Sequence, residues 1–467
     1  MDVETRSIEF IPESERYGSP ARLFSIWFSA NMQVTALIIG ALGVLEGLNV
    51  FWGIAAALLG TSIGTIFMAA HSAQGPQLGI PQMIQSRAQF GVLGAGLPLA
   101  IIVFAYVLFT AANDVVMRSS VQAAIPVSDN LAIALFGALT LLIAFIGYEL
   151  IHRMAIWMSI LSLALFLVVA IFAAQHHYPV GTWSPHAAGF RFQPFVLGMM
   201  QAASWSIGFA PYVADYSRYL PSKVKTSRTF WYSYYGQFLG SGLIMSVGAA
   251  LGSYVPHLLD DPGRAVAALL PVGRWAATII IILGVLEISV LNIYSAYMSA
   301  TTIFTGFRGV ARISKSVKFL VIALMSAVAT LIAMATQYNF SAYFSDILVA
   351  QLYFIVPWTA INLCDFYLVR LGKYSVPDIY CETGQYGRYN FATIAIMLIT
   401  LVAQIPFMNL SFYEGPIAQY FAADVTIFIS LFLPGLLYYV ANRKLIAQAR
   451  VATAAQQPLR APAAARR

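Results

Sequence analysis

Long apolar stretches recur along nearly the whole chain, and runs such as 101–112 and 319–335 show no alternation of apolar and polar positions. A helix needs about 20 apolar residues to span the hydrocarbon of a bilayer. A membrane β-barrel would instead show segments of about ten residues in which apolar and polar positions alternate. Because only helices and closed barrels can span a bilayer, the pattern predicts an all-α polytopic membrane protein.

Charged residues and Pro or Gly breaks divide the chain into twelve candidate spans. They lie near residues 25–49, 51–71, 96–118, 129–148, 153–175, 194–217, 231–254, 274–304, 318–337, 344–369, 390–410 and 421–441. Lys and Arg collect on the cytoplasmic side of membrane proteins. With the N-terminus inside, 22 of the 26 Lys and Arg residues fall on that side, and only Arg118, Arg191, Arg264 and Arg274 fall outside. We therefore expect twelve transmembrane helices in the inner (cytoplasmic) membrane, with both termini cytoplasmic.

The composition agrees with a chain embedded in a lipid bilayer. Of the 467 residues, 60% are hydrophobic and 10% are charged, whereas soluble domains have about 25% charged residues. The net charge of +7 is spread along the borders of the spans, so it does not predict a nucleic-acid partner. Residues 1–24 read as a cytoplasmic N-terminal segment without a secretory leader, and 443–467 as a disordered cytoplasmic tail.

Motifs of soluble catalysis are missing from the sequence. The gaps between spans reach only about twenty residues, too short for a folded domain, and the chain has no G-x-S-x-G, H-E-x-x-H or P-loop pattern. Its two cysteines, Cys364 and Cys381, indicate neither a disulfide framework nor a metal site. We expect no enzyme activity, no cofactor and no metal.

Two spans carry polar or helix-breaking residues at membrane depth, where polar groups usually mark a pathway or a bound solute. The first contains the polar stretch 29–35, and the sixth contains Trp205, Gly208 and Pro211. Glycine and proline also occur in membrane helices without any such role. However, the two spans are corresponding members of two five-helix halves of opposite orientation, and paired interruptions of this kind indicate a central transport site.

The third and eighth spans add aromatic and amide side chains. Phe109 lies one helical turn before Asn113, so both lie on one face. The eighth span carries Glu287 and Asn292 far from any basic residue; Glu287 could also be a protonated, structural acid. Aromatic faces stack on flat rings, and amides both donate and accept. Without Arg or Lys at any span centre, the set favours a neutral, flat solute such as a nucleobase over an organic anion.

Several stretches resemble the nucleobase–cation symporter-1 family, especially its purine–cytosine permease branch. They are LGIPQMIQSR at 78–87 with Phe90-Gly91, DYSRYLP at 215–221, NIYS at 292–295, and Pro357-Trp358 with NLCDFY at 362–367. The resemblance extends from about residue 9 to 442. It implies a LeuT-class fold with alternating access: spans one to five (25–175) and six to ten (194–369) as inverted repeats, followed by two C-terminal helices (390–441).

The resemblance also implies positions for the substrate and the coupling ion. The substrate site falls on Gln33, Phe109, Asn113, Trp205 and Asn292, with Phe109 where many members have Trp and Asn113 where they have Gln. A sodium site would use the carbonyls of Ser29 and Met32 and two neighbouring hydroxyls of the eighth span.

This sequence departs from that sodium site. Two registers of the eighth span put Val290 and Leu291, or Leu286 and Glu287, where the hydroxyls should be, so neither register supplies both. Both registers leave Glu287 beside the cation position. We therefore expect a proton to be the coupling ion, with sodium bound by an ionised Glu287 as the alternative.

The cytoplasmic ends of two further spans supply gate candidates. Asp215 and Arg218 are one turn apart and could pair with each other or with the inner gate, or form a solvated helix end. Trp358 and Asn362 could belong to a gate or serve helix packing.

The sequence thus predicts a secondary active transporter that imports a nucleobase, a purine or a cytosine-type pyrimidine, by cation symport. The alternatives are a related heterocycle (allantoin, hydantoin or a vitamin-precursor pyrimidine) as substrate, a sensor that binds a base without moving it, and a membrane-embedded enzyme.

Overall fold

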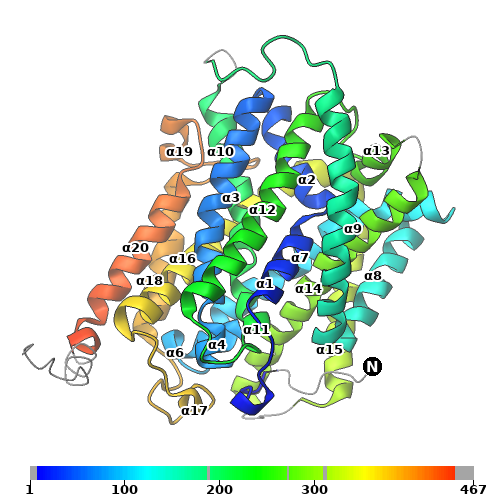
Figure 1. Ribbon diagram of the computed structural model, residues 1–467. Helices are drawn as coiled ribbons and strands as arrows, with labels where there is room; N and C mark the ends of the chain where they lie inside the picture. Colours follow the sequence, from blue (N-terminus) through cyan, green and yellow to red (C-terminus); the bar gives the residue numbers. More distant parts are fainter. Residues whose placement is uncertain (1–7, 187–189, 271–272, 309–312, 448–467) are drawn as a thin grey trace, which may run out of the picture.

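The computed structural model describes residues 8–186, 190–270, 273–308 and 313–447, and it shows a helical bundle. Both ends of the described chain lie at the same end of the bundle, together with α4, α6 and α17 (Figure 1). The expected tail at 443–467 begins with a helical stretch at 443–447, and its remainder lies outside the described residues.

Long helices form the body of the bundle. They are α1 (Ala21–Asn31), α2 (Val34–Leu45), α3 (Val50–Ser72), α7 (Gly96–Ala124), α8 (Asp129–Ile146), α9 (Tyr148–Gln175), α10 (Phe192–Ile207), α12 (Thr226–Gly252), α14 (Arg274–Arg308), α15 (Lys315–Thr336), α16 (Phe340–Cys364), α18 (Phe391–Gln404) and α20 (Thr426–Ala441).

Short elements connect them. They are η1 (Glu13–Glu15), α4 (Gly75–Leu78), α5 (Gln82–Gln85), α6 (Arg87–Phe90), η3 (Ala210–Tyr212), α11 (Val213–Ser217), α13 (Pro262–Ala268), η4 (Gln337–Asn339), the π-helix η5 (Asp365–Val369), α17 (Val376–Ile379), η6 (Ile405–Phe407), the antiparallel pair β1 (Asn409–Leu410) and β2 (Tyr413–Glu414), and α19 (Pro416–Phe421).

By length and composition, seven of the described helices could cross a membrane unaided, and the bent pair α1–α2 makes an eighth span. α18 and α20 are apolar but shorter. α10 with α11, and α12, occupy the positions expected for the sixth and seventh spans. Each expected span thus has a helical counterpart, although the count of twelve membrane crossings stays a prediction.

The first span is broken between α1 and α2, whose axes differ by 60°. Gln33 has an extended backbone (φ −151°, ψ 165°), and its side-chain oxygen accepts a hydrogen bond from the Thr35 amide at 2.6 Å. This side-chain cap replaces an intrahelical partner that the break removes. The polar stretch of the first span therefore interrupts the helix, as the sequence predicts.

The sixth span is broken as well. α10 ends at Ile207, Gly208 and Phe209 form a turn, and Pro211 lies in η3 before α11 continues. Proline lacks an amide hydrogen and glycine permits irregular backbone, which explains the position of this break.

Small residues let the first span approach α12 closely. A Cβ on Gly40 of α2 would lie 2.0 Å from the Met245 carbonyl oxygen, and one on Gly248 would lie 1.9 Å from that of Leu37. Backbone contact through small residues is the usual packing of membrane helices. α1, α2, α3, α10 and α12 consequently form one group, and α7 packs against α8, α14 and α15 in another.

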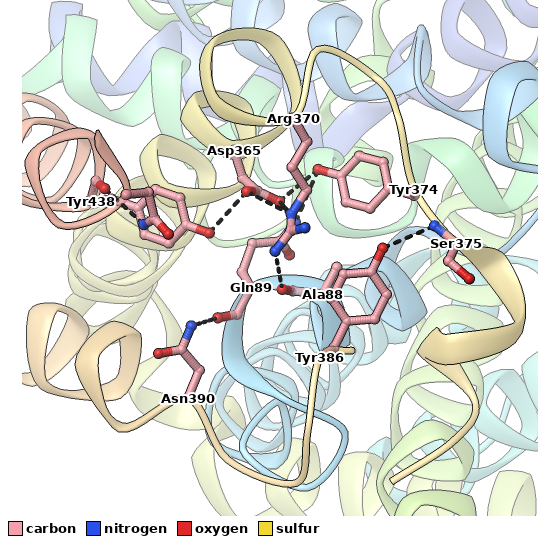
Figure 2. A network of polar contacts seen from close by, with 10 residues as sticks. Ala88, Gln89, Asp365, Arg370, Tyr374, Ser375, Tyr386, Asn390 and Tyr438 are labelled. Atoms are coloured by element: carbon pink, nitrogen blue, oxygen red, sulfur yellow. Dashed lines mark hydrogen bonds and ion pairs between the residues drawn. The ribbon is translucent and has the colours of Figure 1, made fainter. Parts of the chain in front are cut away.

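A buried carboxylate holds the loops at the end of the bundle that carries α6 and α17 (Figure 2). Asp365, fully buried in the π-helix, accepts hydrogen bonds from Gln89 of α6 (2.7 Å), Tyr374 (2.6 Å) and Tyr438 of α20 (2.9 Å), and pairs with Arg370 at 3.1 Å. The Asp365 network fixes α6 against the π-helix and α20.

Replacing Asp365 by Ala should lower the stability of the protein by about 3–5 kcal/mol, because it leaves the Arg370 charge partly buried without its carboxylate. Thermal unfolding of the detergent-solubilised protein measures this loss. Asp260→Ala, at an exposed site, is the matched control. Equal melting temperatures for the two variants would contradict a stabilising role for this network.

Candidate functional site

A small cavity of about 20 Å³ lies between α7, α10, α14 and α16, beside the break in the sixth span. It holds about one water, so a larger solute requires the helices to part. Its lining residues are Tyr106, Phe109, Trp205, Gly208, Phe209, Tyr212, Ile288, Asn292 and Gln351. None of them is charged.

Two aromatic side chains from different helices line this cavity, with their rings steeply inclined to each other. The rings of Phe109 and Trp205 lie 6.5 Å apart with an interplanar angle of 69°, and Phe209 lies 5.7 Å from Trp205. The Trp205 indole N–H donates to Asn31 Oδ1 at 2.6 Å, which fixes the orientation of the ring. The cavity thus presents preoriented faces on which a planar ring can stack.

Asn31 is a hub that the sequence analysis did not identify as part of the site. Its Oδ1 also accepts from Ser241 (2.7 Å) and Gln237 (3.1 Å) of α12, and its Nδ2 donates to Gln237 Oε1 at 2.7 Å. This last residue of α1 therefore positions Trp205. The polar stretch 29–35 contains Asn31 and could have indicated it. Its partners Trp205 and Gln237, however, lie more than 170 residues away along the chain.

The three amides expected at the site take different positions. Asn292 lines the cavity, whereas Gln33 and Asn113 are not among its lining residues and are joined to each other through Thr35. The Thr35 amide donates to Gln33 Oε1, and its hydroxyl donates to Asn113 Oδ1 at 3.0 Å. Gln33 Nε2 and Asn113 Nδ2 are buried without a hydrogen-bond partner among the described residues. Both are therefore donors that lack an acceptor.

The expected coupling residues meet where α1 ends against α14. The Ser29 hydroxyl donates to Glu287 Oε1 at 2.6 Å, and Glu287 Oε2 is buried without a partner in the described part of the chain. A Cβ on Gly284, one turn before Glu287, would lie 3.3 Å from Gln33 Cβ and 3.8 Å from the Met32 carbonyl oxygen. Ser29 and Glu287 are thus in contact near the break in the first span, and Met32 lies near the preceding turn of α14. Their role in coupling stays a prediction.

Asp215 and Arg218 are buried rather than solvated. Asp215 Oδ1 accepts from the Gln82 amide of α5 at 2.8 Å, so the end of the sixth span holds the loop between α3 and α7. Arg218 donates to the Glu9 carbonyl at 3.2 Å and to the Tyr219 hydroxyl at 3.2 Å. Their burial excludes the solvated helix end, whereas the gate role stays a prediction.

Trp358 and Asn362 contact the end of α3. The Trp358 ring stacks on the His71 ring (4.7 Å, 7°), and its N–H donates to Ser86 Oγ at 2.9 Å. Asn362 Oδ1 accepts from Gln74 at 2.9 Å. These contacts join α16 to α3 and to the segment 75–90. Both roles considered for the two residues, a gate and helix packing, are compatible with them.

Sequence reasoning missed five of the cavity residues. They are Tyr106, Phe209, Tyr212, Ile288 and Gln351. Tyr106 donates to the Gly208 carbonyl at 3.1 Å, and Gln351 donates to the Ser204 carbonyl at 3.1 Å, so both satisfy backbone groups at the end of α10 and the adjoining turn. Such contacts depend on which helices become neighbours.

Comparison with known proteins agrees with this geometry. The model of a family of permeases for cytosine/purines, uracil, thiamine and allantoin matches residues 10–431. The chain is 41% identical over 441 residues to the putative purine-cytosine permease YxlA of Bacillus subtilis (strain 168), covering 94% of this chain and 96% of that protein. Identity to the purine-cytosine permease FCY21 of Saccharomyces cerevisiae is 27%, over 81% of this chain and 74% of that protein.

Two solved structures of the transporter Mhp1 share the fold. The closed conformation of this nucleobase-cation-symport-1 family transporter, with bromovinylhydantoin bound, has a TM-score of 0.74 at 17% identity, covering 95% of this chain and 96% of that chain. The inward-facing conformation has a TM-score of 0.72 at 18% identity, covering 98% and 99%. The predicted all-α, LeuT-class membrane fold is confirmed.

The family model covers most of the chain, and the resemblance seen in the sequence is confirmed. The chain is therefore a multi-pass membrane protein that belongs to the family of permeases for cytosine and purines, uracil, thiamine and allantoin.

Proposed function

We propose that this protein imports a nucleobase, a purine or a cytosine-type pyrimidine, by proton symport with alternating access. Its family membership makes it a transporter rather than an enzyme. The relatives described as purine-cytosine permeases support the substrate class. The proposal includes an inner-membrane location with both termini cytoplasmic. The excess of Lys and Arg expected on that side supports this orientation.

One observation carries the substrate class: an uncharged aromatic cavity with unpaired amide donors beside it. Phe109 and Trp205 supply the ring faces, and Asn292 adds an amide to the lining. Gln33 and Asn113 each keep a buried, unpaired NH₂ group. A nucleobase offers a flat ring and several acceptor edges, so it would satisfy these donors at little electrostatic cost.

Alternating access fits the two broken spans. The cavity of about 20 Å³ is too small for a base, so the broken spans must move apart to admit one. On its inner side, Trp27 packs against Tyr212 and Tyr216 at 6.1 and 5.5 Å, which closes the cytoplasmic route. The proposed inverted repeats, 25–175 and 194–369, would move against each other around the site, and the helices at 390–441 would lie outside both repeats.

A related heterocycle is the second candidate substrate. The family description includes allantoin and thiamine, Mhp1 was solved with a hydantoin, and a 23% identical relative is the vitamin B6 transporter TPN1 of Saccharomyces cerevisiae. Accumulation of radiolabelled base in proteoliposomes tests transport, and binding without accumulation would indicate a sensor. A thermal-shift panel of purines, pyrimidines, allantoin and hydantoin identifies the substrate.

Asn113→Ala and Asn292→Ala should each weaken base binding by about 1–3 kcal/mol, the usual cost of leaving a buried polar partner unpaired. Equilibrium binding of labelled base to the purified variants measures this loss. Asn130→Ala, at the exposed second residue of α8, is the control. Wild-type affinity in both site variants would show that the cavity does not hold the base.

A further inference from the structure

The first span ends at Leu45, before the expected bound of 49, so Glu46 is the C-cap of α2 and lies just outside the spanning helix. This end of α2 lies at the end of the bundle opposite α4 and α17 (Figure 1). Gln201 of α10 donates from Nε2 to Glu46 Oε1 at 3.4 Å. The same nitrogen donates to Ser345 Oγ of α16 at 2.8 Å. Glu46 thus lies where the outer halves of both broken spans meet α16.

Two oxygens of this group are buried and unsatisfied. Glu46 Oε2 and Gln201 Oε1 both lack a hydrogen-bond partner among the described residues. An ionised carboxylate only accepts hydrogen bonds, so it cannot pair with the amide oxygen. A protonated carboxyl can donate to that oxygen, which would satisfy both atoms with one hydrogen bond.

We propose that Glu46 is a second proton-binding site, at the extracellular side of the cavity. When Glu46 is protonated, it forms two hydrogen bonds with the Gln201 amide: Gln201 Nε2 donates to Oε1, and the protonated Oε2 donates to Gln201 Oε1. This pair joins the outer ends of α2 and α10. With its oxygen satisfied by Glu46, Gln201 keeps its NH₂ group for Ser345 of α16. A proton bound from outside therefore closes the outer side of the cavity. This inference rests on the proposed transport function and orientation.

The burial of Glu46 agrees with a proton site, because no neighbouring charge outweighs it. Burial raises the pKa of Glu46 from 4.5 to about 7, against a smaller lowering by the Gln201 hydrogen bond. Arg191, at the start of α10, lies against Gly47, and Asp346, beside Ser345, is already bonded to Ser411. The other elements packed on α2 carry Arg264 in α13, with Asp261 at the N-cap of that helix, and Arg274 at the start of α14. α3 and α12 carry no charged residue near this end.

The direction of the pH effect follows from these values. In an open conformation water would hold the Glu46 pKa near its ordinary 4.5, whereas burial in the closed one raises it to about 7. The closed conformation therefore binds the proton more tightly between these values. A fall in outer pH through this interval should favour closure, and a pH above about 7 should favour opening.

Infrared difference titration of the purified protein tests the proton site without any base. The test uses a Glu287→Gln background, which removes the other carboxyl proposed to exchange a proton. In that background we expect a carboxyl C=O band that appears as the pH falls through about 7, is lost when Glu46→Gln is added, and remains when Glu414→Gln, an exposed acid of β2, is added instead. In Gln201→Leu the band should shift in frequency, because the protonated acid loses its amide partner. A band that survives in Glu46→Gln, or that Gln201→Leu does not shift, would overturn the proposal.

Base exchange at equal pH on both sides of proteoliposomes tests the consequence for the gate. The wild type and Glu414→Gln should show a change in exchange rate near pH 7 that is missing in Glu46→Gln, whose amide imitates the protonated acid. An unchanged pH profile in Glu46→Gln would contradict the gating role. If no base is bound or exchanged while the infrared band titrates as expected, the proposed function fails and the proton site stands.

Discussion

Glu287→Gln should abolish accumulation of the base while leaving exchange of base across the membrane intact. The amide keeps an oxygen for the Ser29 hydroxyl, which donates to Glu287 at 2.6 Å, so the contact between α1 and α14 survives. It cannot gain or lose a proton, however, and Oε2 is the carboxyl oxygen that lacks a partner among the described residues. Coupling to the proton gradient should therefore fail, and the internal concentration should not exceed the external one.

Uptake and counterflow of labelled base in proteoliposomes separate these two properties. Glu414→Gln, an exposed acid outside the site, should accumulate base as the wild type does. Wild-type uptake that follows a sodium gradient at fixed pH, and that a protonophore does not affect when the membrane potential is clamped, would contradict proton coupling. It would favour the alternative in which an ionised Glu287 binds sodium.

Trp205→Ala should lower the affinity for the base by about one to two orders of magnitude. Stacking of a base on an aromatic side chain contributes about 1–3 kcal/mol, and a tenfold change in affinity corresponds to about 1.4 kcal/mol. Asn31 Oδ1 keeps its contacts with Ser241 and Gln237 in this variant, so the break in the first span should persist. The loss should therefore affect binding more than folding.

Isothermal titration with the preferred base measures the change, and thermal unfolding checks the fold. Trp275→Ala at the start of α14, where the side chain is 62% exposed, is the matched tryptophan control. Trp205→Phe should recover part of the affinity, because it restores a ring without the hydrogen bond to Asn31. Wild-type affinity in Trp205→Ala would show that the base does not stack on this indole.

Several features of this protein could be predicted from local sequence, because they depend on local composition. The length of the apolar runs determines that the chain is a helical membrane protein, since no other element satisfies its backbone in lipid. The breaks at Gln33 and Gly208 follow from polar, Gly and Pro residues inside apolar runs. The resemblance to the permease family, now confirmed, placed Ser29 and Glu287 at one site although they lie 258 residues apart.

The exact partners of the polar side chains could not be predicted in this way. Asn31 positions Trp205, Thr35 joins Gln33 to Asn113, and Glu46 meets Gln201. Each of these contacts crosses between helices that are distant in the chain, and a rotation of one helix by a single residue would replace it. Helical periodicity determines which face of a helix is polar. Only the packing of the helices decides which two polar groups form a hydrogen bond, because a buried donor or acceptor pairs with the group that the neighbouring helix presents.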